Sequence, residues 1–99
     1  MKRRTSGRNT KSRSRPGGLL RLLRKQRGFT LRDVHVASIR IARKLKQPAY
    51  EIPPSRLHDI EVKGIVPNIY RMYALSCAYR CSFRRLLAYY NIQPVFRKL

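Results

Sequence analysis

The chain has 99 residues, enough for one small domain with a single hydrophobic core. Its 24 Lys and Arg against 4 Asp and Glu give a formal net charge of +20, so isolated copies repel one another and attract polyanions, with nucleic acid as the first candidate. No apolar stretch approaches the roughly 20 residues that a membrane-spanning helix needs, and the composition therefore excludes a membrane span.

Residues 1–18 are predicted to form a disordered basic arm. They carry seven cations and no acid, and no apolar residue follows Met1, so the segment has nothing to bury against the entropy of ordering. Pro16-Gly17-Gly18 then predicts a hinge in front of the folded domain. The cations of the arm are Lys2, Arg3, Arg4, Arg8, Lys11, Arg13 and Arg15.

The first residues also bear on where the protein resides. The charged start at Met1 to Arg4 is followed by polar residues, where a secretory signal would need an apolar segment. We therefore expect a cytoplasmic protein associated with the nucleoid. A leader rich in Arg and Ser and free of acids is also typical of an organelle transit peptide, which remains the alternative.

A first helix is predicted at about residues 18–27. Four leucines between positions 19 and 23 lie near one side of this helix, and four cations, among them Arg24, lie toward the other. Gly28 is expected to end the helix, because glycine adopts the left-handed backbone conformation at low steric cost.

A second helix is predicted to begin after Thr30 and to run to about Leu45. Thr30 and Asp33 have the spacing of a capping box, in which each side chain bonds the backbone N–H of the other residue. The residues that follow at helical spacing on the inner face are Val34, Ala37, Ser38, Ile41 and Leu45.

The next segment, residues 46–54, contains three prolines and is predicted to be a loop with a short extended stretch at Tyr50-Glu51-Ile52. A short third helix follows over residues 55–61, with Leu57 and Ile60 on its buried side. Asn68 and Ser82 are expected to cap a fourth and a fifth helix, and residues 91–99 to form a C-terminal tail. The expected fold is therefore all-α, with five helices in a domain over residues 19–90.

Two parts of this order resemble the Cro/phage-repressor-like (XRE-type) helix-turn-helix family. One is the stretch from Gly28 to Asp33 at the start of the second helix; the other is the stretch from Ser55 to Glu61 with the following Lys63-Gly64. Shorter matches at residues 67–70 and 83–87 keep the same order, so the resemblance covers about residues 19–90.

The resemblance implies a λ-repressor-like domain whose third helix lies in the major groove of DNA. It implies that the outward side chains of that helix read bases, and these are Ser55, Arg56, His58 and Asp59. It also implies phosphate contacts before and after the two helices, from Thr30, Arg32, Lys63 and the backbone N–H of Gly64.

Two departures from the family pattern are visible. Residues 39–51 add about a dozen residues between the second and third helices, which lengthens the second helix and inserts a loop. Pro53-Pro54 stands where polar side chains and free N–H groups meet DNA, so some contacts there are lost. Glu61 would be repelled by DNA, and we interpret it as a structural partner of a nearby Arg.

Several other residues have a structural interpretation. The spacing of Tyr70, Tyr73, Tyr79, Tyr89 and Tyr90 favours core or dimer contacts over a base-stacking platform. His35 is expected to be packed and His58 to lie on the surface. Cys77 and Cys81 lack further ligands at metal-binding spacing, and no catalytic set is evident, so we expect no metal, cofactor, small-molecule ligand or enzymatic activity.

These features together predict a DNA-binding transcriptional regulator that reads duplex DNA with its third helix. A homodimer through the fifth helix and Tyr89-Tyr90 is part of this hypothesis. Two alternatives stay open. One is a structural, ribosome-associated RNA-binding protein, because a basic arm can thread between RNA helices. The other is a helical protein-interaction module with acidic partners.

Overall fold

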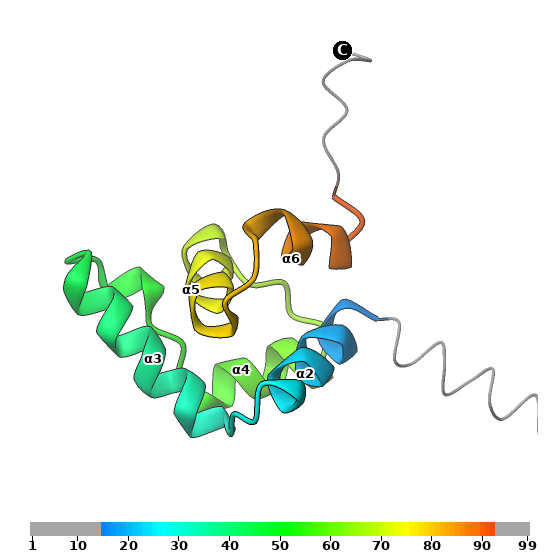
Figure 1. The fold of residues 1–99 in the computed structure, drawn as a ribbon, viewed down its shortest axis with the longest axis horizontal. Coiled ribbons are helices and arrows are strands. Elements are labelled where there is room, and N and C mark those ends of the chain that lie inside the picture. The colour runs from blue at the N-terminus through cyan, green and yellow to red at the C-terminus, as the bar shows by residue number, and fades with distance from the viewer. Residues whose placement is uncertain (1–14, 93–99) are drawn as a thin grey trace, which may run out of the picture.

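A computed structural model describes residues 15–92, and within this range the chain is all-helical, without strands. It has five α-helices and one 3-10 turn, η1 (Figure 1). In chain order these are α2 (Pro16–Gln26), α3 (Leu31–Lys44), η1 (Pro48–Tyr50), α4 (Pro54–Val62), α5 (Ile69–Tyr79) and α6 (Phe83–Tyr89). The all-α prediction with five helices is confirmed. The basic arm up to residue 14 and the tail from residue 93 lie outside the described range.

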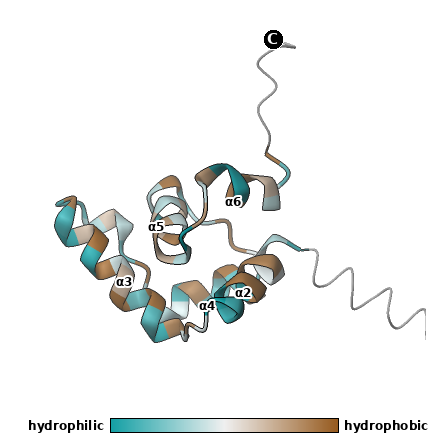
Figure 2. Ribbon diagram, viewed as in Figure 1, coloured by the Kyte–Doolittle hydropathy of each residue, from teal (hydrophilic) through white to brown (hydrophobic). Residues whose placement is uncertain are grey.

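The helices surround one core, with α5 near the middle (Figure 1). Helices α3 and α6 lie at opposite ends of the molecule, and α2 and α4 pack against each other along its lower edge in this view. Figure 2 shows hydrophobic and hydrophilic residues interleaved along α2 and α3, which is the pattern of helices with one apolar and one polar face.

Every α-helix contributes to the core. Leu57 and Ile60 are fully buried, as the sequence predicts, and they anchor α4. The other buried apolar side chains are Leu20, Leu23, Val34, Ala42, Ile52, Met72, Ala74, Leu75, Tyr79 and Leu86. The inner face of α3 is shorter than expected, because Leu45 lies beyond the last turn and is exposed.

The helix ends follow the local signals in the sequence. The Thr30 N–H donates to the Asp33 carboxylate at 2.8 Å and the Asp33 N–H donates to Thr30 Oγ1 at 3.0 Å, which confirms the capping box. Gly28 has a φ of +77°, and the following Phe29 N–H donates to the Arg24 carbonyl, so glycine ends α2 as predicted.

Two local predictions are wrong. Pro16-Gly17-Gly18 is not a hinge but the first turn of α2, because proline suits the first helical position and Gly17 allows a close approach to α4. A Cβ atom on Gly17 would lie 2.5 Å from the carbonyl oxygens of both Ile60 and Glu61. The predicted extended stretch is wrong at Tyr50, which belongs to η1 because the Gln47 side chain accepts from the Ala49 N–H and sets up the 3-10 turn, whereas Glu51 is extended.

None of the helices in residues 15–92 combines the length and the apolar character that crossing a bilayer requires.

Candidate nucleic-acid interface

Helix α4 separates its side chains into an anchored face and an open face. Leu57, Ile60 and Glu61 are buried against the rest of the domain, whereas Ser55, Arg56 and His58 are exposed. The pattern follows from the helical spacing, which returns to the same side every three or four residues. Three of the four side chains predicted to read bases therefore face solvent together on one short helix.

Asp59, the fourth of these side chains, is half-buried and engaged. Its Oδ1 lies 3.6 Å from Nζ of Lys63, one helical turn later. Such a solvent-exposed pair contributes little to stability, so Lys63 can exchange the carboxylate for a phosphate. The structure thus brings one predicted base-reading residue next to one predicted phosphate-binding residue.

The first turn of α4 has fewer hydrogen-bond donors than an ordinary helix start. Pro53 is the N-cap without a side-chain cap bond, and Pro54 is the first helical residue. Because proline has no N–H, the first free backbone donors of α4 belong to Ser55 and Arg56.

The predicted phosphate contacts at the start of α3 are exposed, but one is already occupied. Within the capping box the Thr30 N–H and the Asp33 carboxylate satisfy each other, and the hydrogen bonds from Thr30 hold the pKa of Asp33 below its usual value. The side chains of Thr30 and Arg32 are both exposed. Gly64, with a φ of +77°, is exposed just after α4. Helix α3 packs against α4, and Figure 1 places its N-terminal end near α4.

A buried ion pair joins α4 to α2. Arg24 donates to both carboxylate oxygens of Glu61, from Nε at 2.7 Å and from Nη2 at 3.0 Å, and Nη1 donates to the Phe29 carbonyl at 2.8 Å. The two side chains are only 9% and 2% exposed, and the bond to Glu61 raises the pKa of Arg24. The interpretation of Glu61 as a structural partner of an Arg is confirmed. The placement of Arg24 on the polar face of its helix is wrong, because this pairing draws it inward.

The connector between α3 and α4 is held by polar contacts that the sequence analysis missed. The Ile52 N–H donates to Ser38 Oγ at 2.9 Å, and that hydroxyl donates to the His35 carbonyl. His35 Nε2 lies 3.1 Å from the Glu51 carboxylate, and Arg71 Nε donates to the Glu51 carbonyl at 2.9 Å. A buried serine on the apolar face of α3 was the available signal, because a buried hydroxyl needs a partner.

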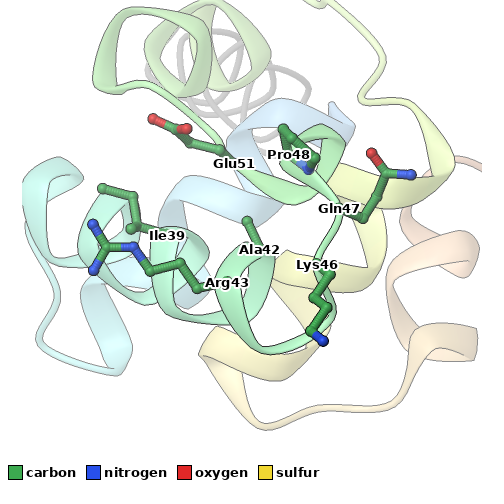
Figure 3. Close-up of a pocket in the computed structure, with 7 residues that line it drawn as sticks. All are labelled: Ile39, Ala42, Arg43, Lys46, Gln47, Pro48 and Glu51. Carbon is green, nitrogen blue, oxygen red and sulfur yellow. The ribbon is translucent and has the colours of Figure 1, made fainter.

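A groove runs between the end of α3 and this connector (Figure 3). In Figure 3 the side chains of Arg43 and Lys46 point in different directions, and Glu51 lies on another side of the groove. These charged groups do not converge on one point of the groove.

The tyrosines do not share one environment. Tyr79 is fully buried and its hydroxyl has no hydrogen-bond partner within the described residues. Burial raises the pKa of Tyr79, and also raises the pKa of Tyr90 to about 12. Tyr70 and Tyr73, by contrast, are 41% and 43% exposed and pack edge-on against Tyr50. They are therefore not core residues, and of the expected core or dimer contact only the dimer contact stays a prediction for these two.

The two histidines and the two cysteines lie at exposed or half-buried positions. His35 is half-buried beside Glu51 and His58 is exposed, in agreement with the sequence prediction. Cys77 is exposed, whereas Cys81 is half-buried, and burial raises its pKa. Across residues 15–92, no three His, Cys, Asp or Glu side chains are close enough together to hold a metal ion.

All four Asp and Glu side chains of the protein are engaged internally. Asp33 is bonded by Thr30, Glu51 by His35, Asp59 by Lys63 and Glu61 by Arg24. The remaining cations of the surface therefore have no Asp or Glu side chain to neutralise them among residues 15–92, which favours binding of an external polyanion. The exposed cations of the described range are Arg15, Arg21, Lys25, Arg27, Arg32, Arg40, Arg43, Lys44, Lys46, Arg56, Lys63, Arg80, Arg84 and Arg85.

Comparisons of the chain with protein families, with characterised proteins and with solved structures gave no significant match.

Proposed function

We propose that the protein is a DNA-binding transcriptional regulator that places α4 in the major groove of duplex DNA. The observation that carries this proposal is the open face of α4. Ser55, Arg56 and His58 are exposed on a short helix whose opposite face is buried, on a chain with a net charge of +20. A helix presented in this way fits the width of the major groove, where each base pair displays a distinct set of donors and acceptors.

The side chains of α4 suit different base edges. Arg56 can donate two parallel hydrogen bonds to O6 and N7 of guanine, and Ser55 can serve several bases. His58 lies one turn from Ser55 and extends the reading face. Asp59 can accept from N4 of cytosine once Lys63 has moved to a phosphate.

Phosphate contacts would fix the position of α4 without adding sequence information. We assign these contacts to Thr30, Arg32, Lys63 and the backbone N–H of Gly64, all of which belong to exposed residues. The basic arm would add a non-specific tether that follows the backbone or enters a neighbouring minor groove. This role uses binding alone and calls for no catalytic group or cofactor.

The order of the helices supports a helix-turn-helix domain of the Cro/phage-repressor-like type as the framework. Helix α3 would contact the DNA backbone and α4 would be the recognition helix. The chain would differ from that pattern in its α3 of 14 residues and in the connector pinned by Ser38. A cytoplasmic, nucleoid-associated dimer formed through α6 belongs to the same proposal.

Two single substitutions test this assignment. Arg56→Ala should relax preference at one base position, because it removes a base contact and leaves the phosphate contacts in place. Lys63→Ala should weaken binding to all sequences nearly alike and make the dependence of log K on log salt shallower by about one unit. Both effects are measured by binding titrations on a panel of duplexes that differ at single positions. An equal loss on every sequence for both variants would contradict the reading role of α4.

Structured RNA is the second candidate, and one observation favours it. Tyr70 and Tyr73 are half-exposed on α5, where unpaired bases can stack on an aromatic ring. Competition between duplex DNA and a structured RNA at matched salt separates the two candidates. We expect the duplex to displace the RNA, and a clear preference for the RNA would replace the first proposal with the second.

A further inference from the structure

Helix α3 carries a continuous ridge of exposed residues on the side opposite the core. Its cations are Arg32, Arg40, Arg43 and Lys44, and Val36 lies between the first two. The buried residues of the same helix are Val34, Ser38 and Ala42. At 100° per residue the two groups point in opposite directions, so these cations face solvent, one from the first turn of the helix and three from its last five residues.

Among residues 15–92, the cations of this ridge lack carboxylate partners. The only acid of α3, Asp33, is bonded by Thr30, and the other three Asp and Glu side chains pair with His35, Lys63 and Arg24. Like charges three or four residues apart destabilise a helix by a few tenths of a kcal/mol per pair. The helix macrodipole favours Arg43 and Lys44 in the last turn but does not reach Arg40. An external anion bound along the ridge would offset the repulsion among all four cations.

The ridge starts at a proposed phosphate contact. Arg32 lies in the first turn of α3, and Lys44 lies about 18 Å farther along the helix at 1.5 Å per residue. That length matches roughly five base pairs of duplex at 3.4 Å each. Arg40, Arg43 and Lys44 all lie in the part of α3 that lengthens the helix toward the connector, whereas the N-terminal end of α3 lies near α4 (Figure 1).

We infer that the exposed ridge of α3 is a second nucleic-acid surface, which lies along the sugar–phosphate backbone beside the bases read by α4. Arg40, Arg43 and Lys44 would each neutralise a phosphate of the same duplex. This inference rests on the proposed function and extends it, because it explains what the longer α3 contributes. Its contribution is to affinity and salt dependence and not to the choice of sequence.

The test is a variant with Arg40→Gln, Arg43→Gln and Lys44→Gln. Glutamine keeps a high helix propensity and removes three charges. Because each lost phosphate contact changes the slope of log K against log salt by about 0.9, we expect a slope shallower by about 2.7. The ratio of the parent's affinity for the duplex to that of the variant should then fall by about 40-fold between 50 and 200 mM salt, with the base preference unchanged.

The matched control is a variant with Arg21→Gln, Lys25→Gln and Arg80→Gln. It removes the same charge from exposed positions outside α3, α4 and the proposed dimer contact at α6. An equal change of slope in both variants would mean that only net charge matters, and would overturn the inference. A third variant, with Arg40→Lys and Arg43→Lys, should keep the slope of the parent.

The outcomes separate this inference from the proposed function. If the parent chain binds no duplex, the proposed function fails. If the parent binds a duplex but the ridge variant keeps the parental slope, only the inference about α3 fails. Should the triple variant not fold, as circular dichroism would show, the single variants take its place, each with an expected change of about 0.9 in slope.

Discussion

The two ends of α4 are held in different ways. At the C-terminal end, the backbone of α4 touches Gly17 of α2, and the buried pair of Arg24 and Glu61 ties the two helices together. At the N-terminal end, the connector is held by polar contacts through Ser38, and the neighbouring pair of His35 and Glu51 is partly open to solvent. The contact with α2 therefore supplies stability, whereas the connector sets where α4 begins.

The largest expected effect comes from breaking the buried ion pair. Glu61→Ala would leave the Arg24 guanidinium buried without its counter-charge, and should lower the free energy of unfolding by about 3–5 kcal/mol. Chemical denaturation measures this loss. The double variant Arg24→Met with Glu61→Leu replaces the pair by apolar side chains and should recover most of the stability. A double variant as unstable as Glu61→Ala would show that the loss has another origin.

The close approach at Gly17 should give the next largest effect. Gly17→Ala would place a Cβ atom 2.5 Å from two carbonyl oxygens of α4, so the helices must separate, at about 1–3 kcal/mol or more. Gly18→Ala is the control, because Gly18 borders a surface hollow beside Leu22 and Val62. In a thermal melt the control should match or exceed the parent, since alanine favours the helix by up to about 1 kcal/mol. Equal melting of both variants would contradict the tight contact.

At the other end of α4, Ser38→Ala removes the acceptor of the buried Ile52 N–H. An unsatisfied buried donor costs about 1–3 kcal/mol, and we expect a loss in this range together with weaker base discrimination by α4. Ser76→Ala is the matched control, because that buried hydroxyl bonds only the Tyr73 carbonyl within its own helix. If both variants lost equal stability and kept full discrimination, the connector would have no positioning role.

The smallest effect concerns the Tyr79 hydroxyl, which lies in the region of the α2 contact. Burial raises the pKa of Tyr79, so the folded state disfavours the phenolate. The contribution of the Tyr79 hydroxyl to the free energy of unfolding is therefore fully present below its unfolded pKa of about 10, and it is lost as the pH rises above that value. Tyr79→Phe should change stability at pH 7 by less than about 0.5 kcal/mol, because the hydroxyl has no hydrogen-bond partner among residues 15–92.

At alkaline pH the same variant should differ from the parent. Tyr79→Phe should remain folded to a higher pH in a titration followed by circular dichroism, whereas Tyr70→Phe, on a half-exposed ring, should follow the parent. Identical alkaline transitions for all three proteins would contradict the cause given for the Tyr79 shift.

Local signals in the sequence predicted much of the fold. The capping box at Thr30, the glycine stop at Gly28 and the caps at Asn68 and Ser82 all lie where the sequence places them, because each depends on residues a few positions apart. The burial of Leu57 and Ile60, and with it the open face of α4, followed from helical spacing alone.

Contacts between distant residues were harder to predict. Arg24 carries the charge of a surface residue, and only the approach of Glu61, 37 positions later, draws it into the interior. Gly17 has the local signature of a hinge, and its role depends on the backbone of α4. Ser38 accepts from Ile52 across the whole connector. Local signals at Glu61 and Ser38 can indicate that a partner is needed, but they do not identify that partner, because each pairing arises only when the helices meet.

The central claim is that the open face of α4 reads the edges of base pairs. Selection of bound duplexes from a random pool, with the parent chain and with Arg56→Ala, tests this claim most directly. We predict that the parent enriches a consensus, with half-site symmetry if a dimer binds, and that Arg56→Ala loses preference at one position of each site. A parent chain that enriches no sequence, or an Arg56→Ala pool identical to that of the parent, would contradict the account.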